Sequence, residues 1–373
     1  MNEILYWIWF QERSMLCTAS TKTLLEALGS AEEVYRCSNF SCYPNMSAKD
    51  ITIFMNKNLD DAERILHTSN TLGIRIITYD SDLYPANLRE ITNPPYVLYA
   101  KGNIFDFNNT LHIGIVGTRH CSEYGVSVTR RFCSEMADYG IVTISGMARG
   151  IDTEVAYSTL NSGGMTIAVL GCGIDVCYPP ENYEIMEMVE KKGLLLSEFP
   201  PGTPPLNFHF PMRNRIISGI SHGILIIESA KKGGSLITAN LAIEQGKDVF
   251  AIPGSIFNKN SEGTNKLISS TAARAVTSVA DIVDDFSYRF SPKKVTVSSA
   301  TPVDIPSGES SFFENFSGTE RQIAELLLSG PLYAGEIQQL LDIPVAEFSN
   351  SLSVLEFSGV IERASGNIYK LKI

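Results

Sequence analysis

The chain has 373 residues, 44% of them hydrophobic and 19% charged, which is typical of a soluble globular protein of roughly two or three domains. Its formal net charge of −11 argues against binding nucleic acid or anionic membranes through overall charge, so a polyanionic ligand would require a local basic site. The seven cysteines include no Cys-x-x-Cys pair and the five histidines show no metal-ligand spacing, so we predict neither a metal site nor a disulfide framework.

Residues 1–100 are predicted to form a mostly helical domain. The segment STKTLLEALGSAEEVYRCS combines a Ser/Thr start, a leucine stripe and a stop at Gly29. The apolar run ILYWIWF follows Glu3, has no basic residues before it and is too short to span a bilayer, so it predicts a buried helix. No other segment looks transmembrane, and we expect a cytoplasmic protein with no membrane partner.

Residues 101–286 show a different pattern, in which apolar runs of strand length alternate with helical stretches. The runs are nearly continuous, as expected for strands covered on both faces. They are LHIGIVG, GIVTISG, MTIAVLG, GLLLSE, HGILIIES and KDVFAIPG. Six repeats of strand and helix predict an α/β domain with a Rossmann-like, doubly wound parallel sheet.

The C-terminal part is predicted to be a linker followed by a small domain. Residues 287–311 are rich in Ser and Pro and show no period, which is typical of a linker. Residues 312–373 predict three helices and then two short strands, the winged-helix layout. This domain carries four basic against eight acidic residues, and its expected recognition helix, 345–357, has no Lys or Arg. We therefore favour a protein-contact or self-contact module over a reader of duplex DNA.

Gly, Ser, Thr and Arg recur where the predicted strands of the α/β domain end. In a parallel sheet these positions lie at one edge, and glycine turns before helices expose N–H groups that bind anions. Such turns are Gly117-Thr118-Arg119, Gly146 to Gly150 and Gly233-Gly234-Ser235. With Arg119, Arg149, Arg213 and Arg215 nearby, they predict one extended anion-binding surface that pools its positive charges.

The stretch FHFPMRNRIISG, residues 208–219, is expected to be a loop that presents Arg213 and Arg215 without acidic partners, because it contains no Asp or Glu. Phe208 and Phe210 flank His209, and each is suited either to core packing or to stacking on bases. Arginines on a phosphate track together with aromatic rings favour a single strand over a duplex, whose bases are already stacked.

Cofactor binding and catalysis are weakly indicated. The segment VLGCGIDV begins like a dinucleotide fingerprint, but Val176 occupies the position of its third glycine, and no Walker motif is present. We therefore predict no cofactor. Glu198, Glu228 and Asp152 lie near strand ends as candidate acids or bases, yet each is equally suited to capping a helix or pairing with an arginine. No catalytic residue is predicted, and His209 is assigned a hydrogen-bonding role.

Several long segments resemble the DprA/Smf family of DNA-processing proteins. They are IVGTRHCSEYG, ISGMARGIDTEVA, TIAVLGCGIDVCYPPEN, FPMRNRIISGIS, GSLITANLAIEQGKDVFAIPG and GTNKLI. The resemblance covers about residues 60 to 285 closely and the N-terminal helices loosely, which implies a helix-hairpin-helix or SAM-like N-terminal domain. The tail is similar to the winged-helix appendix of many members.

This resemblance implies a homodimer that binds single-stranded DNA without sequence preference and loads the recombinase RecA on it during natural transformation. The residues implied as DNA contacts are Gly117, Thr118, Arg119, Gly146, Arg149, Gly150, Phe210, Arg213, Asn214, Arg215, Ser235, Leu236 and Thr238. The chain departs from the family at Lys247, where Arg is more common, and in SSTAARAV, which lacks the usual Gly-Ala. The second departure lies in the segment similar to the family's dimer-forming region.

Two other functions stay open. A phosphoribohydrolase that cleaves nucleotides uses a similar sheet, but its Pro-Gly-Gly-x-Gly-Thr turn is followed by a Glu. Here the corresponding turn runs from Lys232 to Thr238, and no Glu follows before Glu244. A pure scaffold, whose anion surface recognises an acidic protein, is the third alternative.

Overall fold

The computed structural model describes residues 3–17, 20–43, 46–290, 318–327, 332–341, 343–358, 360–364 and 368–371. The chain separates into two compact units, Met1–Thr296 and Val297–Ile373. From residue 291 onward, the predicted linker 287–311 lies outside the described residues. Among the helices that are described, none combines the length and the apolar character needed to cross a membrane.

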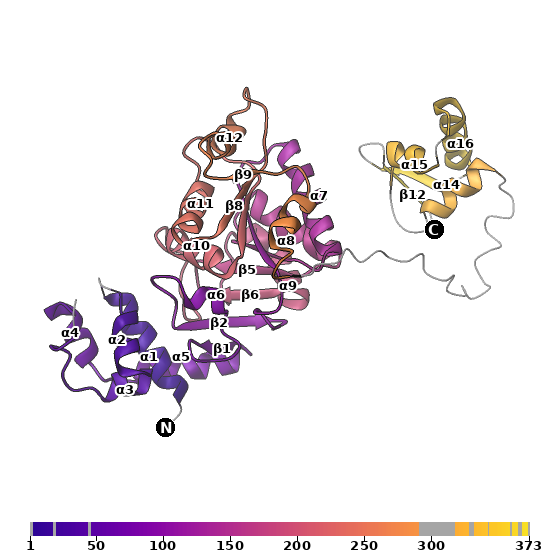
Figure 1. The fold of residues 1–373 in the computed structure, drawn as a ribbon. Helices are drawn as coiled ribbons and strands as arrows, with labels where there is room; N and C mark the ends of the chain where they lie inside the picture. Colours follow the sequence, from indigo (N-terminus) through magenta and orange to yellow (C-terminus); the bar gives the residue numbers. More distant parts are fainter. Residues whose placement is uncertain are drawn as a thin grey trace. The chain divides into compact units, whose positions relative to one another are not determined.

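The larger unit contains a nine-stranded sheet with the strand order β1-β2-β6-β5-β4-β3-β7-β8-β9 (Figure 1). Its strands are β1 Arg75–Thr78, β2 Val97–Gly102, β3 His112–Val116, β4 Val142–Ser145, β5 Thr166–Leu170, β6 Leu194–Ser197, β7 Gly223–Ile226, β8 Asp248–Ala251 and β9 Arg274–Ala275. Neighbouring strands from β6 to β9 are parallel, whereas β2 pairs antiparallel with both β1 and β6. The predicted α/β, Rossmann-like sheet is confirmed, and its six predicted strands are β3 to β8.

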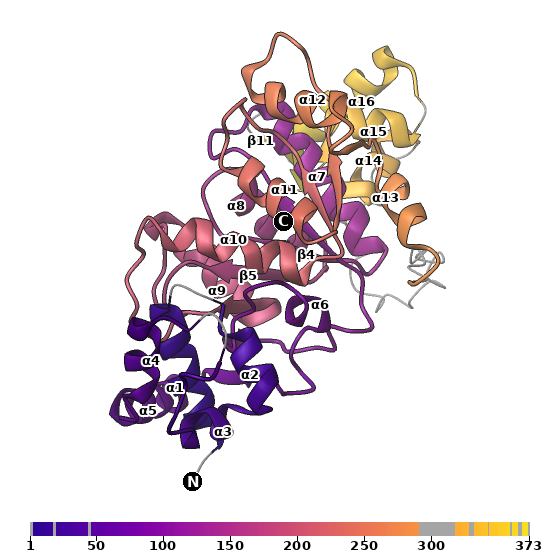
Figure 2. The same cartoon turned by 60° about the vertical axis from the view of Figure 1, so that its left-hand side comes forward.

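Helices cover both faces of this sheet (Figures 1 and 2). They are α6 Ala86–Arg89, α7 Glu123–Asp138, α8 Ile151–Asn161, α9 Tyr183–Lys192, α10 His209–Ile220, α11 Ser235–Glu244, α12 Glu262–Ser269 and α13 Val279–Phe286, with short 3₁₀ turns at Pro180–Asn182 and Lys259–Ser261. Alternate residues of one strand enter opposite cores. In β7, Ile224 and Ile226 pack with α10 and α11, while Leu225 packs with α7, α8 and α13. Because both faces are buried, the strands read as continuous apolar runs.

The N-terminal helices pack beside strands β1 and β2. They are α1 Glu3–Leu16, α2 Lys22–Leu28, α3 Ala31–Arg36, α4 Ala48–Met55 and α5 Asp60–Thr71. Every residue from Leu5 to Gln11 in α1 is buried, as the apolar run predicted. Gly29 ends α2 with φ of 88°, a conformation that glycine adopts without steric cost. Strand β1 precedes the boundary predicted near residue 100 and β2 crosses it, and both belong to the same sheet as the core. The boundary itself stays a prediction.

The smaller unit has its own apolar core around Ile323, Ile337 and Leu355. Its elements are α14 Thr319–Leu327, β10 Leu332–Tyr333, α15 Ala334–Leu341, α16 Val345–Phe357, β11 Ile361–Ala364 and β12 Ile368–Leu371. The strands pair antiparallel in the order β10-β12-β11. The three predicted helices and two C-terminal strands are present in that order, and the winged-helix assignment of 312–373 stays a prediction.

Candidate functional site

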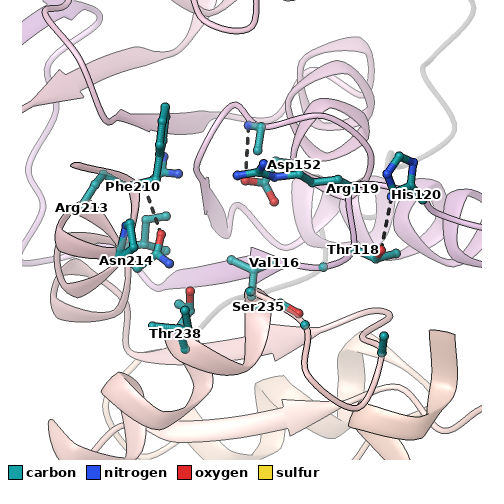
Figure 3. A pocket seen from close by; sticks show the side chains of 18 of the residues that line it. Val116, Thr118, Arg119, His120, Asp152, Phe210, Arg213, Asn214, Ser235 and Thr238 are labelled. Carbon is teal, nitrogen blue, oxygen red and sulfur yellow. Dashed lines mark hydrogen bonds between the residues drawn. The ribbon is translucent and has the colours of Figure 1, made fainter. Parts of the chain in front are cut away.

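A cleft opens at the carboxyl edge of the parallel sheet, where the chain direction along the sheet reverses. Strands β4, β5 and β6 continue on one side of β3, whereas β7, β8 and β9 continue on the other. The loops after β3 and β7 therefore diverge, and crevices for ligands form at such points. The cleft has a volume of about 540 Å³ and is bounded by these two loops, by α10 and by the first turn of α11 (Figure 3).

Most of the residues predicted to contact a ligand line this cleft. They are Gly117, Thr118, Arg119, Phe210, Arg213, Asn214, Ser235 and Thr238. Gly146 and Arg149 line a small adjoining hollow together with Arg119 and Phe210. Three predicted residues lie elsewhere. Leu236 packs into the core, Gly150 is outside both hollows, and Arg215 lines a separate cleft between α10 and the N-terminal helices.

The stretch 208–219 was predicted to be a loop, and this prediction is wrong: it forms most of helix α10. Pro211 lies in the first turn, where a helix tolerates proline because the missing N–H has no intrahelical partner. Residues two apart on a helix point to opposite sides, since each residue turns the helix by about 100°. Arg213 therefore faces the cleft and Arg215 faces away from it.

Arg213 is buried and its guanidinium donates to backbone carbonyl groups inside the protein, so the expectation of a free cation is wrong here. Its Nη1 donates to the carbonyl oxygen of Gly146 at 2.6 Å and to that of Val169, at the ends of β4 and β5. A side-chain Cβ at Gly146 would lie 2.4 Å from this Nη1. Burial lowers the pKa of Arg213 to about 10, opposed by the nearby Asp152 carboxylate. Arg213 thus holds together the loops that form one wall of the cleft.

Arg215 is also neutralised, in contrast to its predicted role as an unpaired phosphate contact. Its Nη2 donates to Glu198, a carboxylate with 0% exposed surface. Burial raises the pKa of Glu198, and the positive charge of Arg215 opposes that shift. The predicted pooling of four arginines on one rim is therefore wrong, because two of the four are occupied inside the protein.

The two remaining arginines are exposed, and one has no acidic partner. Arg149 forms an ion pair with Glu181 at the surface, where such pairs contribute little and exchange readily. Arg119 extends from the β3 loop across the cleft (Figure 3). Across the described ranges, no ion pair involves Arg119 or the exposed Lys231 and Lys232 of the β7 loop. The two lysines were missed as candidates, although they directly precede the predicted Gly233-Gly234-Ser235 turn.

Of the three candidate acids, Glu198 pairs with Arg215, and the other two each hold a loop in place. Asp152 is buried and accepts from the backbone N–H groups of Gly146 and Ala148, at 3.1 and 3.4 Å. Burial raises its pKa, and Arg213 opposes this shift. Glu228 accepts from the N–H and the hydroxyl of Ser122, the residue that caps α7. In the described part of the chain, no three His, Cys, Asp or Glu side chains are grouped as metal ligands would be.

The aromatic residues of 208–210 divide between the core and the surface. His209 is buried and stacks on Phe199, with ring centroids 4.0 Å apart. Phe210 lines the cleft and packs against Tyr178, with ring centroids 5.2 Å apart. Tyr178 is a cleft residue that the sequence did not indicate. Phe208 is 61% exposed. The cleft thus offers the face of an aromatic pair beside a free guanidinium.

The first turn of α11 presents backbone to the cleft. Its N-cap residue, Gly234, makes no side-chain cap and has open space around its α carbon. The glycine turn after β4 differs, because a Cβ at Gly150 would lie 2.4 Å from the carbonyl oxygen of Thr118. Gly150 is therefore required by packing between two loops, while Gly234 leaves the α11 N-terminus accessible to an anion.

Comparison with known proteins identifies relatives of the cleft-bearing part of the chain. Residues 75–287 match the family described as DNA recombination-mediator protein A. The chain is 42% identical over 226 residues to the DNA processing protein DprA of Bacillus subtilis, which covers 61% of this chain and 76% of that protein. It is 42% identical over 207 residues to DprA of Streptococcus pneumoniae, covering 56% of this chain and 72% of that protein.

Two crystallised relatives share this architecture. The X-ray structure of DprA from Streptococcus pneumoniae superimposes with a TM-score of 0.64 at 33% identity, over 76% of this chain and 98% of that one. DNA processing protein A from Helicobacter pylori, known in a structure that describes its single-stranded DNA binding mode, gives a TM-score of 0.53 at 27% identity. That match covers 58% of this chain and 97% of the other.

Proposed function

The chain belongs to the DNA recombination-mediator protein A (DprA/Smf) family of DNA-processing proteins, and from this we propose that it binds single-stranded DNA, without sequence preference, in the cleft at the carboxyl edge of its sheet. The observation that carries the proposal is Arg119, an exposed guanidinium that extends into this cleft without an acidic partner among the described residues. In a protein of net charge −11, such a cation marks the local basic site that a polyanion requires.

The lining of the cleft favours a single strand over a duplex. Arg119 in the lining and Lys231 and Lys232 on the adjoining β7 loop supply cations for phosphates, and the uncovered N-terminus of α11 adds the positive end of its helix dipole. Phe210 offers a ring face on which an unpaired base stacks, a contact worth about 1–3 kcal/mol that every base can make. A duplex already stacks its bases and cannot use this face.

Binding without catalysis is the second part of the proposal. Asp152, Glu198 and Glu228, the acids near the strand ends, each hold a backbone turn, a cap or an arginine. These contacts support structural roles for all three. Incubation with nucleoside monophosphates should release no free base, and release of base would instead support the phosphoribohydrolase alternative.

We further propose that the protein acts as a homodimer in the cytoplasm and loads RecA on single-stranded DNA during natural transformation. Membership of the family supports this role. The test is RecA-dependent ATP hydrolysis on single strands coated with single-strand-binding protein, with and without this chain. An unchanged lag before hydrolysis would contradict the loading role. A monomer mass in light scattering would contradict the dimer.

The DNA-binding proposal is tested with Arg119→Ala. Fluorescence anisotropy with a labelled oligothymidylate of about 20 nucleotides gives the dissociation constant over a range of KCl concentrations. Because each phosphate contact contributes about 0.7 to the salt slope of a single strand, the variant should bind more weakly and its slope should fall by about 0.7.

The matched control is Arg64→Ala, an exposed arginine of α5 that removes the same charge far from the cleft. It should leave both affinity and slope unchanged. Equal losses in the two variants would show that overall charge governs binding, and an unchanged Arg119→Ala would place the DNA elsewhere.

A further inference from the structure

The loop between β8 and α12 carries Phe257, the most exposed large hydrophobic side chain among the described residues, and Ile256 beside it. Phe257 is 92% exposed and Ile256 is 81% exposed. The loop follows the carboxyl end of β8 and therefore begins at the edge of the sheet where the cleft opens (Figure 1). Neither residue was indicated by the sequence motifs, and the cleft lining does not include them.

The tip of this loop is held in a defined conformation. The Gly254 backbone and the Asn265 side chain exchange two hydrogen bonds, of 3.2 and 2.9 Å, which close the base of the loop. Within the tip, the N–H of Phe257 donates to the Ser255 hydroxyl and the N–H of Asn258 donates to the Ser255 carbonyl oxygen. A ring on an internally bonded turn loses little conformational entropy when it stacks on a ligand.

Hydrogen bonds attach the loop to both walls of the cleft. The Asn260 side chain donates to the carbonyl oxygen of His120, a cleft residue next to Arg119, at 2.9 Å. The carbonyl oxygen of Asn260 accepts from the N–H of Ser229 at 2.7 Å, one residue before Ala230 in the cleft lining. The exposed tip is thus continuous with the loops after β3 and β7.

The charges around the tip select one kind of occupant. Lys259 follows the tip and is exposed, and in the described ranges it joins no ion pair, like Arg119, Lys231 and Lys232. Phe257 thus lies two residues before the cation Lys259, on a loop that is hydrogen-bonded to the loops carrying Arg119 and Lys231. This combination suits a ligand with flat faces and negative charges. Among macromolecules, a single strand of nucleic acid has this chemistry.

We propose that Phe257, with Ile256 beside it, is a second base-stacking contact that extends the single-stranded DNA track beyond the cleft. The inference rests on the proposed function, because it needs a strand in the cleft. It adds a contact on a different loop from Phe210, joined to the β3 loop by the hydrogen bond from Asn260 to His120.

The test uses Phe257→Trp in the full chain. Both native tryptophans, Trp7 and Trp9, are buried in α1, so a tryptophan at 257 is the exposed emitter that a base can quench. Titration with an oligothymidylate of about 20 nucleotides should quench it in step with binding measured by anisotropy. Phe257→Ala should weaken binding between about 5-fold and 150-fold, the range for one base stacked on an aromatic ring.

An abasic oligonucleotide isolates the stacking contribution, because it keeps the phosphates and lacks the bases. Wild type and Phe257→Ala should bind it equally. The control pair is Tyr288→Ala and Tyr288→Trp, at an 82% exposed aromatic residue after α13, which should change neither affinity nor emission on DNA addition.

The outcomes separate this inference from the proposed function. If wild type does not bind the oligonucleotide, the proposed function itself fails. If wild type binds while Phe257→Ala keeps its affinity and the tryptophan emission is unchanged, the second contact is refuted. Loss of dimer mass in Phe257→Ala with DNA affinity retained would show that a second copy of the chain covers the tip, which also refutes it.

Discussion

Replacing Arg213 by methionine should destabilise the fold, although the residue lies in the wall of the proposed DNA cleft. Methionine keeps much of the side-chain volume but removes the donors to the carbonyl oxygens of Gly146 and Val169. Each buried acceptor left without a partner costs about 1–3 kcal/mol. The buried Asp152 carboxylate also loses a nearby positive charge that opposes the effect of burial on its pKa.

These contributions overlap, because they arise from one guanidinium, so we expect a loss of about 2–5 kcal/mol in the free energy of unfolding. Urea unfolding followed by far-UV circular dichroism measures it as a lower transition midpoint. The control is Arg119→Met, the same change at an exposed arginine of the same cleft, which should stay within about 0.5 kcal/mol of wild type. An unchanged midpoint in Arg213→Met together with lost DNA binding would refute the structural role and make Arg213 a direct contact.

Two further predictions concern buried charges outside the cleft. Arg215→Glu would place a second carboxylate against the buried Glu198, so we expect little folded protein, measured as loss of the cooperative unfolding transition; a folded variant that merely lost DNA binding would contradict this. Burial lowers the pKa of His112 to about 3 and that of His222 to about 4. Because only the unfolded chain binds these protons, stability should be full above about pH 6.5 and fall as pH decreases towards 4. The variant His222→Asn keeps an acceptor for the backbone N–H of His112 and should reduce this pH dependence of the free energy of unfolding in urea. The control His67→Asn, at an exposed histidine, should not reduce it. An equal pH dependence in wild type and both variants would contradict the role of His222.

Local sequence patterns predicted most of the elements that meet at the carboxyl edge of the sheet. The continuous apolar runs predicted β3 to β8. Each of these strands is buried on both faces and therefore needs apolar side chains at consecutive positions, which the sequence shows directly. Parallel strands end at one edge, so the turns after β3 and β7 were expected together and do meet at the cleft. Helix α10 was mistaken for a loop because Pro, Asn and Gly suggested turns, while the first-turn position of Pro211 permits a helix.

The sequence also did not predict which phenylalanine rings are exposed. Phe208 and Phe210, which flank His209, were the predicted candidates for stacking on bases, yet the side chain of Phe257 is far more exposed than either. Its loop is positioned by a hydrogen bond from Asn260 to His120, 140 residues apart in the chain. No short sequence pattern around Phe257 predicts that hydrogen bond.

The positions of the core strands, the α/β class and most of the cleft lining follow from periodicity and turn residues, which act over a few neighbouring positions. Whether each arginine is bonded inside the protein or free to meet a ligand does not follow from such local patterns. Arg213 meets the Gly146 carbonyl 67 residues away, and Arg215 meets Glu198 17 residues away on the other side of the same helix. Which guanidinium is buried and which is free depends on partners that approach only when the chain folds, since electrostatic and hydrogen-bond energies depend on distance in space. For this reason Arg119 alone, of the three arginines on the β3 loop and α10, is left to meet a ligand.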